Sequence, residues 1–597
     1  MTLAAVLEPW LAGPRAAELL FPLLAVPVLA ALLAPLLGAR GARLLALGSL
    51  LLGLALALAA AAALLAAGAP LTYALGGWAA PLGVELALDG PAALMLVLTA
   101  AVLVLVGLHA AGEFRVGAAG RRVTLAFWTL LLGVWAGLNG LYLGRDLFNL
   151  YVAIEVLTFS AVPLVCLKGG AAQLEAAFRY LLFALLGSAL YLLGAGLMLG
   201  LHGTLDIGQI AAALAGGGAD GSATGAVRSG SLAAVVLMST GLLAKTALMP
   251  LHLWLPPAHG GAPAPASAVL SALVVKGSFF LLFRLWLDLV PDPGALHIGL
   301  VLGTLGAFAI LLGNLMALMQ ARLKLLVAYS TLAQLGYLFL LFPLAAGPGG
   351  GPAATAALLQ VVSHALAKAA LFLLAGRVQV AFGHDRLAEL GGFGRALPMT
   401  LVVIVLAGLA LAGLPPSGGY LVKSLYGSAA GAEGWGWRLV LDLGGLLSAA
   451  YLARILAVAV RPAAGGTAAP HLAERPGGFG LLVPGLLALA ALLLGLLPPG
   501  WFALLDVGRA EMASAAAVAG AMRGALAAGG FWSSTGPVLT VALAVVLFIA
   551  AGQSAWQRRV GALGRGLAGV EGRLREWRVA GALLLAILLA QALAVLT

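Results

Sequence analysis

Four lysines lie inside stretches of sequence that otherwise have the composition of membrane-spanning helices. They are Lys245, Lys276, Lys368 and Lys423. A lysine at the centre of a spanning helix costs about 2.5–3.5 kcal/mol even on lenient insertion scales. A lysine held away from water can also give up and regain a proton near neutral pH. The four positions therefore indicate groups that carry charge through a membrane.

A glutamate and a histidine lie in apolar stretches of the same kind. Glu155 is interpreted as the partner of a buried lysine, whose movement would change the proton affinity of the carboxylate. The alternative is a protonated carboxyl group bonded to a nearby hydroxyl, that of Ser160 or Thr158. His364 precedes Lys368 by one helical turn, so both lie on one face. The candidate proton-translocation site consists of Glu155, Lys245, Lys276, His364, Lys368 and Lys423.

Other polar residues in the spans have simpler interpretations. Arg284 lies beside Asp288 and is expected to form a local ion pair. His252 and His259 could bind a metal, but no carboxylate or cysteine accompanies them, so a positional or gating role is favoured. No metal is expected here.

Composition excludes most soluble functions. Of the 597 residues, 63% are hydrophobic and 9% are charged, whereas soluble domains have about 25% charged residues. The net charge of +11 is attributed to the insertion bias of membrane proteins and not to nucleic acid. The single cysteine, Cys166, excludes a disulfide framework and an iron–sulfur centre. No nucleotide or haem motif is present, so no cofactor is expected.

The apolar runs predict an all-α, polytopic membrane protein. We count about 16 candidate spans between residues 16 and 596. If the N-terminus lies outside, most lysines and arginines fall in inside loops, as the positive-inside rule requires.

Helix breakers fall within two of these spans. Met249-Pro250 interrupts the run 231–255, and Leu414-Pro415-Pro416 interrupts the run 398–426. Broken helices at membrane depth are tolerated where protein or a water-filled cavity satisfies the freed backbone groups. Such breaks at matched places in two halves indicate a transport site.

The segment 553–578 differs from the spans. Apolar residues recur there at helical spacing opposite a row of arginines. It is expected to be a basic amphipathic helix, lying either on the inner membrane surface or along partner helices.

Four stretches together resemble the antiporter-like subunits of one superfamily. They are Ala244–Pro263, Leu323–Tyr337, His364–Phe372 and Ala412–Lys423. The superfamily comprises proton-translocating subunits of respiratory complex I, of membrane-bound hydrogenases and of Mrp-type Na+/H+ antiporters. Lys423, with the Pro-Pro-Ser-Gly-Gly run before it, is most similar to the D-type subunits of Mrp antiporters or the N-type subunits of complex I.

The resemblance implies a core of about 14 helices built from two inverted five-helix repeats, followed by about two extra C-terminal spans. It divides the chain into N-terminal helices (1–120), a first repeat (121–290), a second repeat (291–460) and C-terminal helices (461–597). It implies that Glu155 pairs with Lys245, that Lys276, His364 and Lys368 form a central axis, and that Lys423 exchanges protons with the far side.

The sequence departs from the family pattern at two inner loops. Pro257 stands where the family usually has an aspartate, and Arg322 stands where it often has an acidic residue. Both departures affect partner contacts or proton entry and leave the buried charges intact.

The expected function is proton translocation, with or without exchange for Na+, in a multisubunit complex. Its expected partners are other membrane subunits of a complex I-like, hydrogenase or Mrp-type assembly, in a bacterial plasma membrane. Two alternatives stay open: a non-conducting structural or assembly subunit, and a subunit of a redox-driven NADH-quinone oxidoreductase or hydrogenase pump. Any redox centre would belong to another subunit.

Overall fold

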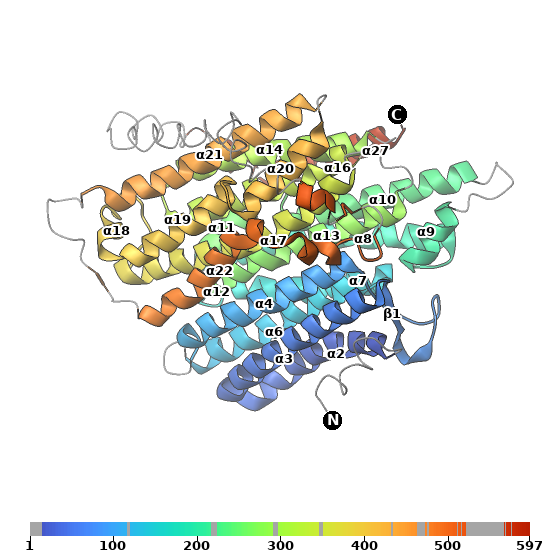
Figure 1. Cartoon of the computed structure of the whole chain (residues 1–597), viewed down its shortest axis with the longest axis horizontal. Coiled ribbons are helices and arrows are strands. Elements are labelled where there is room, and N and C mark those ends of the chain that lie inside the picture. The colour runs from blue at the N-terminus through green and yellow to red at the C-terminus, as the bar shows by residue number, and fades with distance from the viewer. Residues whose placement is uncertain are drawn as a thin grey trace.

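Long helices make up nearly all of the computed structural model (Figure 1). It describes residues 15–115, 120–215, 224–290, 297–345, 350–431, 434–462, 472–473, 477–509, 512–514, 516–520, 566, 569–574 and 576–596. The expected span at 535–552 and residues 553–565 of the expected amphipathic helix lie outside the described residues.

The N-terminal helices form one side of the bundle (Figure 1). They are η1 (Ala16–Leu19), α2 (Leu20–Leu33), η2 (Ala34–Leu37), α3 (Gly38–Ala67), α4 (Gly90–Glu113) and α6 (Arg121–Leu143). Between α3 and α4, β1 (Leu71–Ala74), η3 (Leu75–Gly77) and β2 (Glu85–Leu88) form an antiparallel hairpin in which Leu71 pairs with Leu88. Asp89 caps α4 by accepting a hydrogen bond from the Ala92 amide at 2.9 Å.

The next group of helices contains the first break. It consists of α7 (Leu147–Val165), α8 (Ala171–His202), α9 (Ile207–Ala215), α10 (Thr224–Thr246), α11 (Leu255–Gly261), α12 (Ala264–Val269), η4 (Leu270–Val274) and α13 (Val275–Leu289). The η4 segment is a π-helical turn that joins α12 to α13 within one continuous span.

The following group contains the second break. It consists of α14 (Ile298–Met319), α15 (Leu323–Phe339), α16 (Leu341–Leu344), α17 (Gly350–Phe382), α18 (Phe393–Ala396), α19 (Pro398–Ala412), α20 (Gly418–Ala430) and α21 (Trp435–Val460). After it come η6 (Gly478–Leu481), α22 (Leu482–Leu493), η7 (Leu494–Leu496), η8 (Pro499–Leu504) and α27 (Trp577–Leu596).

Among the described residues, 11 helices are long and apolar enough to cross a membrane, and three shorter apolar helices accompany them. The predicted class, an all-helical polytopic membrane protein, is confirmed. In Figure 1, α17 runs through the middle of the bundle, with α4 on one side and α14, α20 and α21 on the other.

The two breaks share one backbone geometry. After α10, the Ala247 amide bonds to the Ala244 carbonyl and the Leu248 amide bonds to the Leu243 carbonyl. After α19, Gly413 and Leu414 make the same two bonds, to Ala410 and Leu409.

This pair of hydrogen bonds is a Schellman cap, which requires a positive φ at the residue after the helix. The φ angle is 58° at Ala247 and 71° at Gly413. The two expected interruptions are therefore present, and they end their helices in the same way. A cis X–Pro bond follows in both breaks, at Met249-Pro250 and at Pro415-Pro416.

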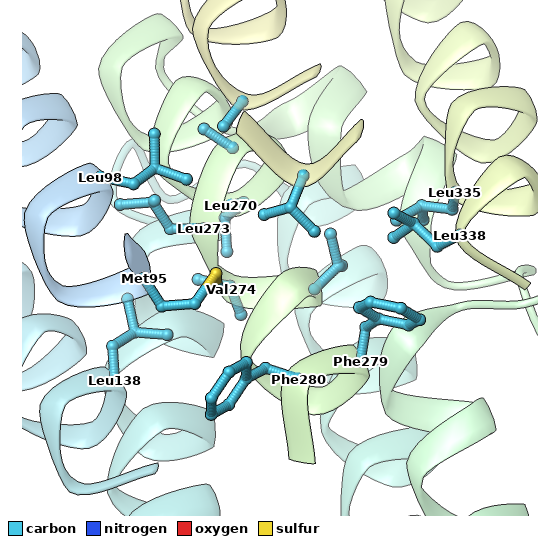
Figure 2. Close-up of a cluster of buried hydrophobic side chains, with 14 of the residues drawn as sticks. Met95, Leu98, Leu138, Leu270, Leu273, Val274, Phe279, Phe280, Leu335 and Leu338 are labelled. Carbon is cyan, nitrogen blue, oxygen red and sulfur yellow. The ribbon is translucent and has the colours of Figure 1, made fainter. Parts of the chain in front are cut away.

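The core around the broken spans is tightly apolar. Figure 2 shows side chains of the segment η4–α13 between those of α4 and α6 on one side and those of α15 on the other. The residues that it labels are Met95, Leu98, Leu138, Leu270, Leu273, Val274, Phe279, Phe280, Leu335 and Leu338. Any charged group on this segment is consequently far from bulk water.

Candidate functional site: a chain of buried charged residues

Glu155 on α7 and Lys245 on α10 form the expected buried pair. The Lys245 ammonium lies 3.6 Å from a Glu155 carboxylate oxygen, and the two side chains are 5% and 14% exposed. The ammonium also donates a hydrogen bond to the Thr158 hydroxyl at 2.8 Å. Lys245 therefore has a carboxylate and a hydroxyl as partners on one helix.

The hydroxyl partner of Glu155 differs from the expected one. Neither Ser160 nor Thr158 bonds to the carboxylate; the Ser188 hydroxyl of α8 donates to it instead. A Cβ atom at Gly187 would lie 2.5 Å from the Gly241 carbonyl oxygen of α10. Small residues thus let the backbones of α8 and α10 approach closely, which brings Ser188 to the pair.

Lys276 lies at the start of α13, just after the π-helical turn. Its ammonium is fully buried and donates to the Ser271 carbonyl within that turn. A π-helical turn alters the regular α-helical hydrogen bonding, and such turns are common at functional sites. The Ser271 hydroxyl in turn lies 2.9 Å from the Thr331 hydroxyl on α15. Lys276 is thereby linked through Ser271 to α15, the helix whose Val327 and Ser330 accept hydrogen bonds from Lys368.

Lys368 and His364 share the face of α17 that points into the bundle. The Lys368 ammonium donates to the Val327 carbonyl at 3.0 Å and to the Ser330 hydroxyl. Neither ring nitrogen of His364 has a hydrogen-bond partner among the described residues. His364 interacts electrostatically with both Lys276 and Lys368, so the three groups are close neighbours.

Two further basic residues belong to this group, although they were not predicted to lie there. His259 on α11 interacts electrostatically with Lys324, Lys276 and Lys368, and its ring stacks on Phe372 at 4.7 Å. Lys324 is buried and donates to the Ala262 carbonyl. The signal was present, because His259 and Lys324 lie inside two of the motif stretches.

Lys423 lies on α20 beside the second break. Its ammonium donates to the Ala412 carbonyl at 2.6 Å and lies 6.0 Å from the centre of the Tyr337 ring. A Cβ atom at Gly445 of α21 would overlap the ammonium, so α21 covers it. Asp442, one turn earlier on α21, interacts electrostatically with Lys423 and was not anticipated.

A separate charged cluster lies near the C-terminal end of α13, the helix that begins beside Lys276. The expected pair is present, with Arg284 and Asp288 4.0 Å apart. Arg509, which follows η8, bonds to both Asp288 and Asp89. Burial alone would raise the pKa of Asp89, but the charges of Arg509 and Arg284 outweigh it, so this pKa is lowered. The cluster ties the C-terminal segment to α4 and α13.

Metal binding has no support among the described residues, where no group of three His, Cys, Asp or Glu side chains could hold an ion. The buried charged groups instead fall into three sets along the chain of helices. They are Glu155 with Lys245, the group of Lys276, His364, His259 and Lys368, and Lys423 beside the second break.

Comparison with known proteins identifies the class. Residues 144–448 match the family model of the NADH:quinone oxidoreductase/Mrp antiporter transmembrane segment. The chain belongs to this family, and it is an antiporter-like membrane subunit of the Mrp and complex I type.

Similar proteins include subunits of both an NADH-quinone oxidoreductase and a Na(+)/H(+) antiporter. The chain is 35% identical to the N subunit of the NADH-quinone oxidoreductase of Desulforudis audaxviator, over 65% of this chain and 75% of that protein. It is 29% identical to the D subunit of the Na(+)/H(+) antiporter of Bacillus subtilis, over 61% of this chain and 70% of that protein. The predicted resemblance is confirmed.

Solved structures show the same fold. A chain of the Mrp complex from Dietzia sp. DQ12-45-1b superposes with a TM-score of 0.70 at 23% identity, over 88% of this chain and 100% of that one. A chain of respiratory complex I from Thermus thermophilus gives 0.59 at 26% identity, over 82% and 99%. Both belong to multisubunit membrane complexes.

Proposed function

We propose that this subunit moves protons across a bacterial plasma membrane along Glu155, Lys245, Lys276, His364, Lys368 and Lys423. The observation that carries the proposal is the buried Glu155–Lys245 pair, 3.6 Å apart beside a broken helix. An ion pair out of contact with water is costly unless both partners stay close. Separating it changes the proton affinity of each partner in opposite directions.

Both groups of the Glu155–Lys245 pair have a second hydrogen-bond partner, which can hold each of them after the pair separates. Lys245 already bonds to Thr158 at 2.8 Å, and Glu155 already accepts from Ser188. Each charged group therefore keeps a hydrogen-bond partner when the other moves away. The proposed switch is a shift of the Lys245 ammonium at the end of α10, where the helix ends at the next residue.

The basic residues of the middle group pass the proton onward. Like charges repel strongly where water is excluded. A proton arriving on Lys276 therefore favours release from its neighbours His364 and Lys368. Lys423 is the terminal exchanger of the proposed route, with the exposed Asp442 as its carboxylate neighbour. On this proposal, residues 121–290 and 291–460 act as two coupled repeats.

The driving force comes from outside this chain. One cysteine cannot ligate an iron–sulfur cluster. The energy source is accordingly either a redox reaction in another subunit or an opposing ion gradient. Na+ is the candidate counter-ion, since one relative is a Na(+)/H(+) antiporter subunit.

The decisive experiment uses the assembled complex in proteoliposomes with an internal pH dye. Lys245→Ala is expected to abolish proton movement while the complex still assembles on a native gel. The matched control is Lys168→Ala, because Lys168 is 59% exposed and pairs with the exposed Glu113. Unchanged proton movement in Lys245→Ala would disprove the route. Replacing external Na+ by an impermeant cation then tells proton–sodium exchange from a redox-driven pump.

A further inference from the structure

The C-terminal extension returns to the bundle and packs against both halves of it. Helix α27 contacts α10 and α14, and Figure 1 places it near the C-terminal end of the chain beside α14. The Thr240 hydroxyl of α10 and the Gln591 side chain form a hydrogen bond of 3.2 Å, and both groups are buried. The extension is thus anchored on the helix that carries Lys245.

Just before α27, the helical residues 569–574 bury a single acidic side chain. Glu571 is 5% exposed, whereas its neighbours Val570, Gly572 and Arg573 are exposed. The Tyr329 hydroxyl of α15 donates to the Glu571 carboxylate. A carboxylate is buried at this cost only where specific partners compensate for the lost water.

The position of Tyr329 places Glu571 near one end of the proton route. Tyr329 lies six residues after the start of α15 at Leu323, or about 9 Å along the helix. Arg322 precedes this start, on the side that the distribution of basic residues predicts to be inside. The next residue, Ser330, bonds to Lys368. Glu571 therefore lies between the expected inner surface and the middle of the route.

A cavity of about 310 Å³ connects Glu571 to the first break. Its polar lining residues are His252 and Glu571, and Met249 and Pro250 lie beside them. The opposite wall consists of apolar residues of α14, among them Leu305 and Leu312. Glu571 and the residues of the first break therefore line one cavity, and its walls are mainly apolar.

We propose that Glu571 is a further proton-carrying residue, which the C-terminal extension supplies to the inner end of the route. The inference rests on the proposed proton translocation. A proton from inner water converts the Glu571 carboxylate to a carboxylic acid. Its release toward the buried basic groups of the route, of which Lys368 bonds to the residue next to Tyr329, restores the carboxylate.

The alternative role for Glu571 is structural, as a hydrogen-bond acceptor that holds the extension in place. Glu571→Gln separates the two, because an amide oxygen still accepts from Tyr329 but the side chain holds no extra proton. Arg573→Gln is the matched control, since Arg573 is exposed on the same short helix. All variants are measured in the assembled complex in proteoliposomes, beside Lys245→Ala.

We expect Glu571→Gln to slow proton movement about tenfold or more, Glu571→Asp to restore part of the rate, and Arg573→Gln to leave it unchanged. Normal transport in Glu571→Gln, with Lys245→Ala inactive, would overturn this inference and leave the proposed function standing. Normal transport in both variants would overturn the proposed function itself.

A second measurement does not depend on the folding of the Glu571 variants. Infrared difference spectra of the resting and energised complexes should contain a carboxyl C=O stretch, and Tyr329→Phe should shift its frequency. Spectra without a carboxyl band that responds to Tyr329→Phe would contradict the proposal.

Discussion

The break after α10 and the break after α19 have the same backbone hydrogen bonds and differ in what surrounds the lysine beside each of them. Lys245 precedes its break and faces a carboxylate 3.6 Å away. Lys423 follows its break and faces the Ala412 carbonyl at 2.6 Å and the ring of Tyr337. Asp442 acts on Lys423 only at longer range.

On the proposed function, this difference suits the two lysines to different tasks. A buried lysine held by a close carboxylate stores its proton until the pair opens. A carbonyl and an aromatic ring stabilise the charged form of a lysine less than a close carboxylate does. Such a lysine releases its proton more readily, which suits a group that exchanges protons with the far side. On the proposed function, one backbone motif therefore serves both a switch at Lys245 and an exchanger at Lys423, and the neighbouring helices decide which.

The largest expected contrast comes from removing each lysine's charge. Lys245→Met leaves the buried Glu155 carboxylate without its cation, which should lower the free energy of unfolding by about 3–5 kcal/mol. Lys423→Met leaves one carbonyl without a donor, and about 1–3 kcal/mol is expected. Titration with SDS, followed by circular dichroism, measures both. Adding Glu155→Gln to Lys245→Met should recover much of the lost stability, because no unpaired carboxylate then remains. Equal stability losses in Lys245→Met and Lys423→Met would contradict the expected difference between the two breaks.

A smaller contrast concerns the capping residues. Gly413→Ala puts a Cβ atom in a left-handed conformation and 2.7 Å from the Lys423 ammonium. The conformation costs about 1–2 kcal/mol, and the ammonium must also leave the Ala412 carbonyl. We expect a stability loss of about that size together with slower transport, measured by the same SDS titration and by the dye assay.

Ala247→Gly is the counterpart at the first break. Relief of the left-handed strain is offset by the greater entropy of glycine in the unfolded chain, about 0.4–1 kcal/mol. The net change should be close to zero. A large loss in Ala247→Gly would show that the two caps are not equivalent.

The local sequence was sufficient to predict the breaks and the buried charges. Proline after a helix end and lysine within an apolar run are local signals. The pairing of Glu155 with Lys245 needed the family resemblance as well, because 90 residues separate the two positions in the chain.

Partners on distant helices could not be predicted in the same way. Ser188 reaches Glu155 because small residues draw α8 and α10 together, and Asp442 reaches Lys423 because Gly445 lets α21 approach. Arg509 bonds to Asp89 from 420 positions away. Such contacts depend on which helix faces pack together, and a single sequence does not contain that information.

The smallest expected effect on stability belongs to Asp442, which is the exposed counterpart of Glu155. Asp442→Asn should change the free energy of unfolding by no more than about 0.5 kcal/mol, since surface substitutions seldom do more. Transport should still slow several-fold, because the asparagine cannot accept a proton from Lys423.

Arg438→Gln is the control for Asp442→Asn. Arg438 lies one turn away on α21 and also interacts electrostatically with Asp442. Its loss removes a competing cation and should leave the rate unchanged or raise it slightly. The dye assay at saturating driving force compares the two variants. If Asp442→Asn transported at the normal rate, Lys423 would release its proton by another path. Lys423 would then lack the working carboxylate partner that Lys245 has in Glu155, although the two breaks share one backbone geometry.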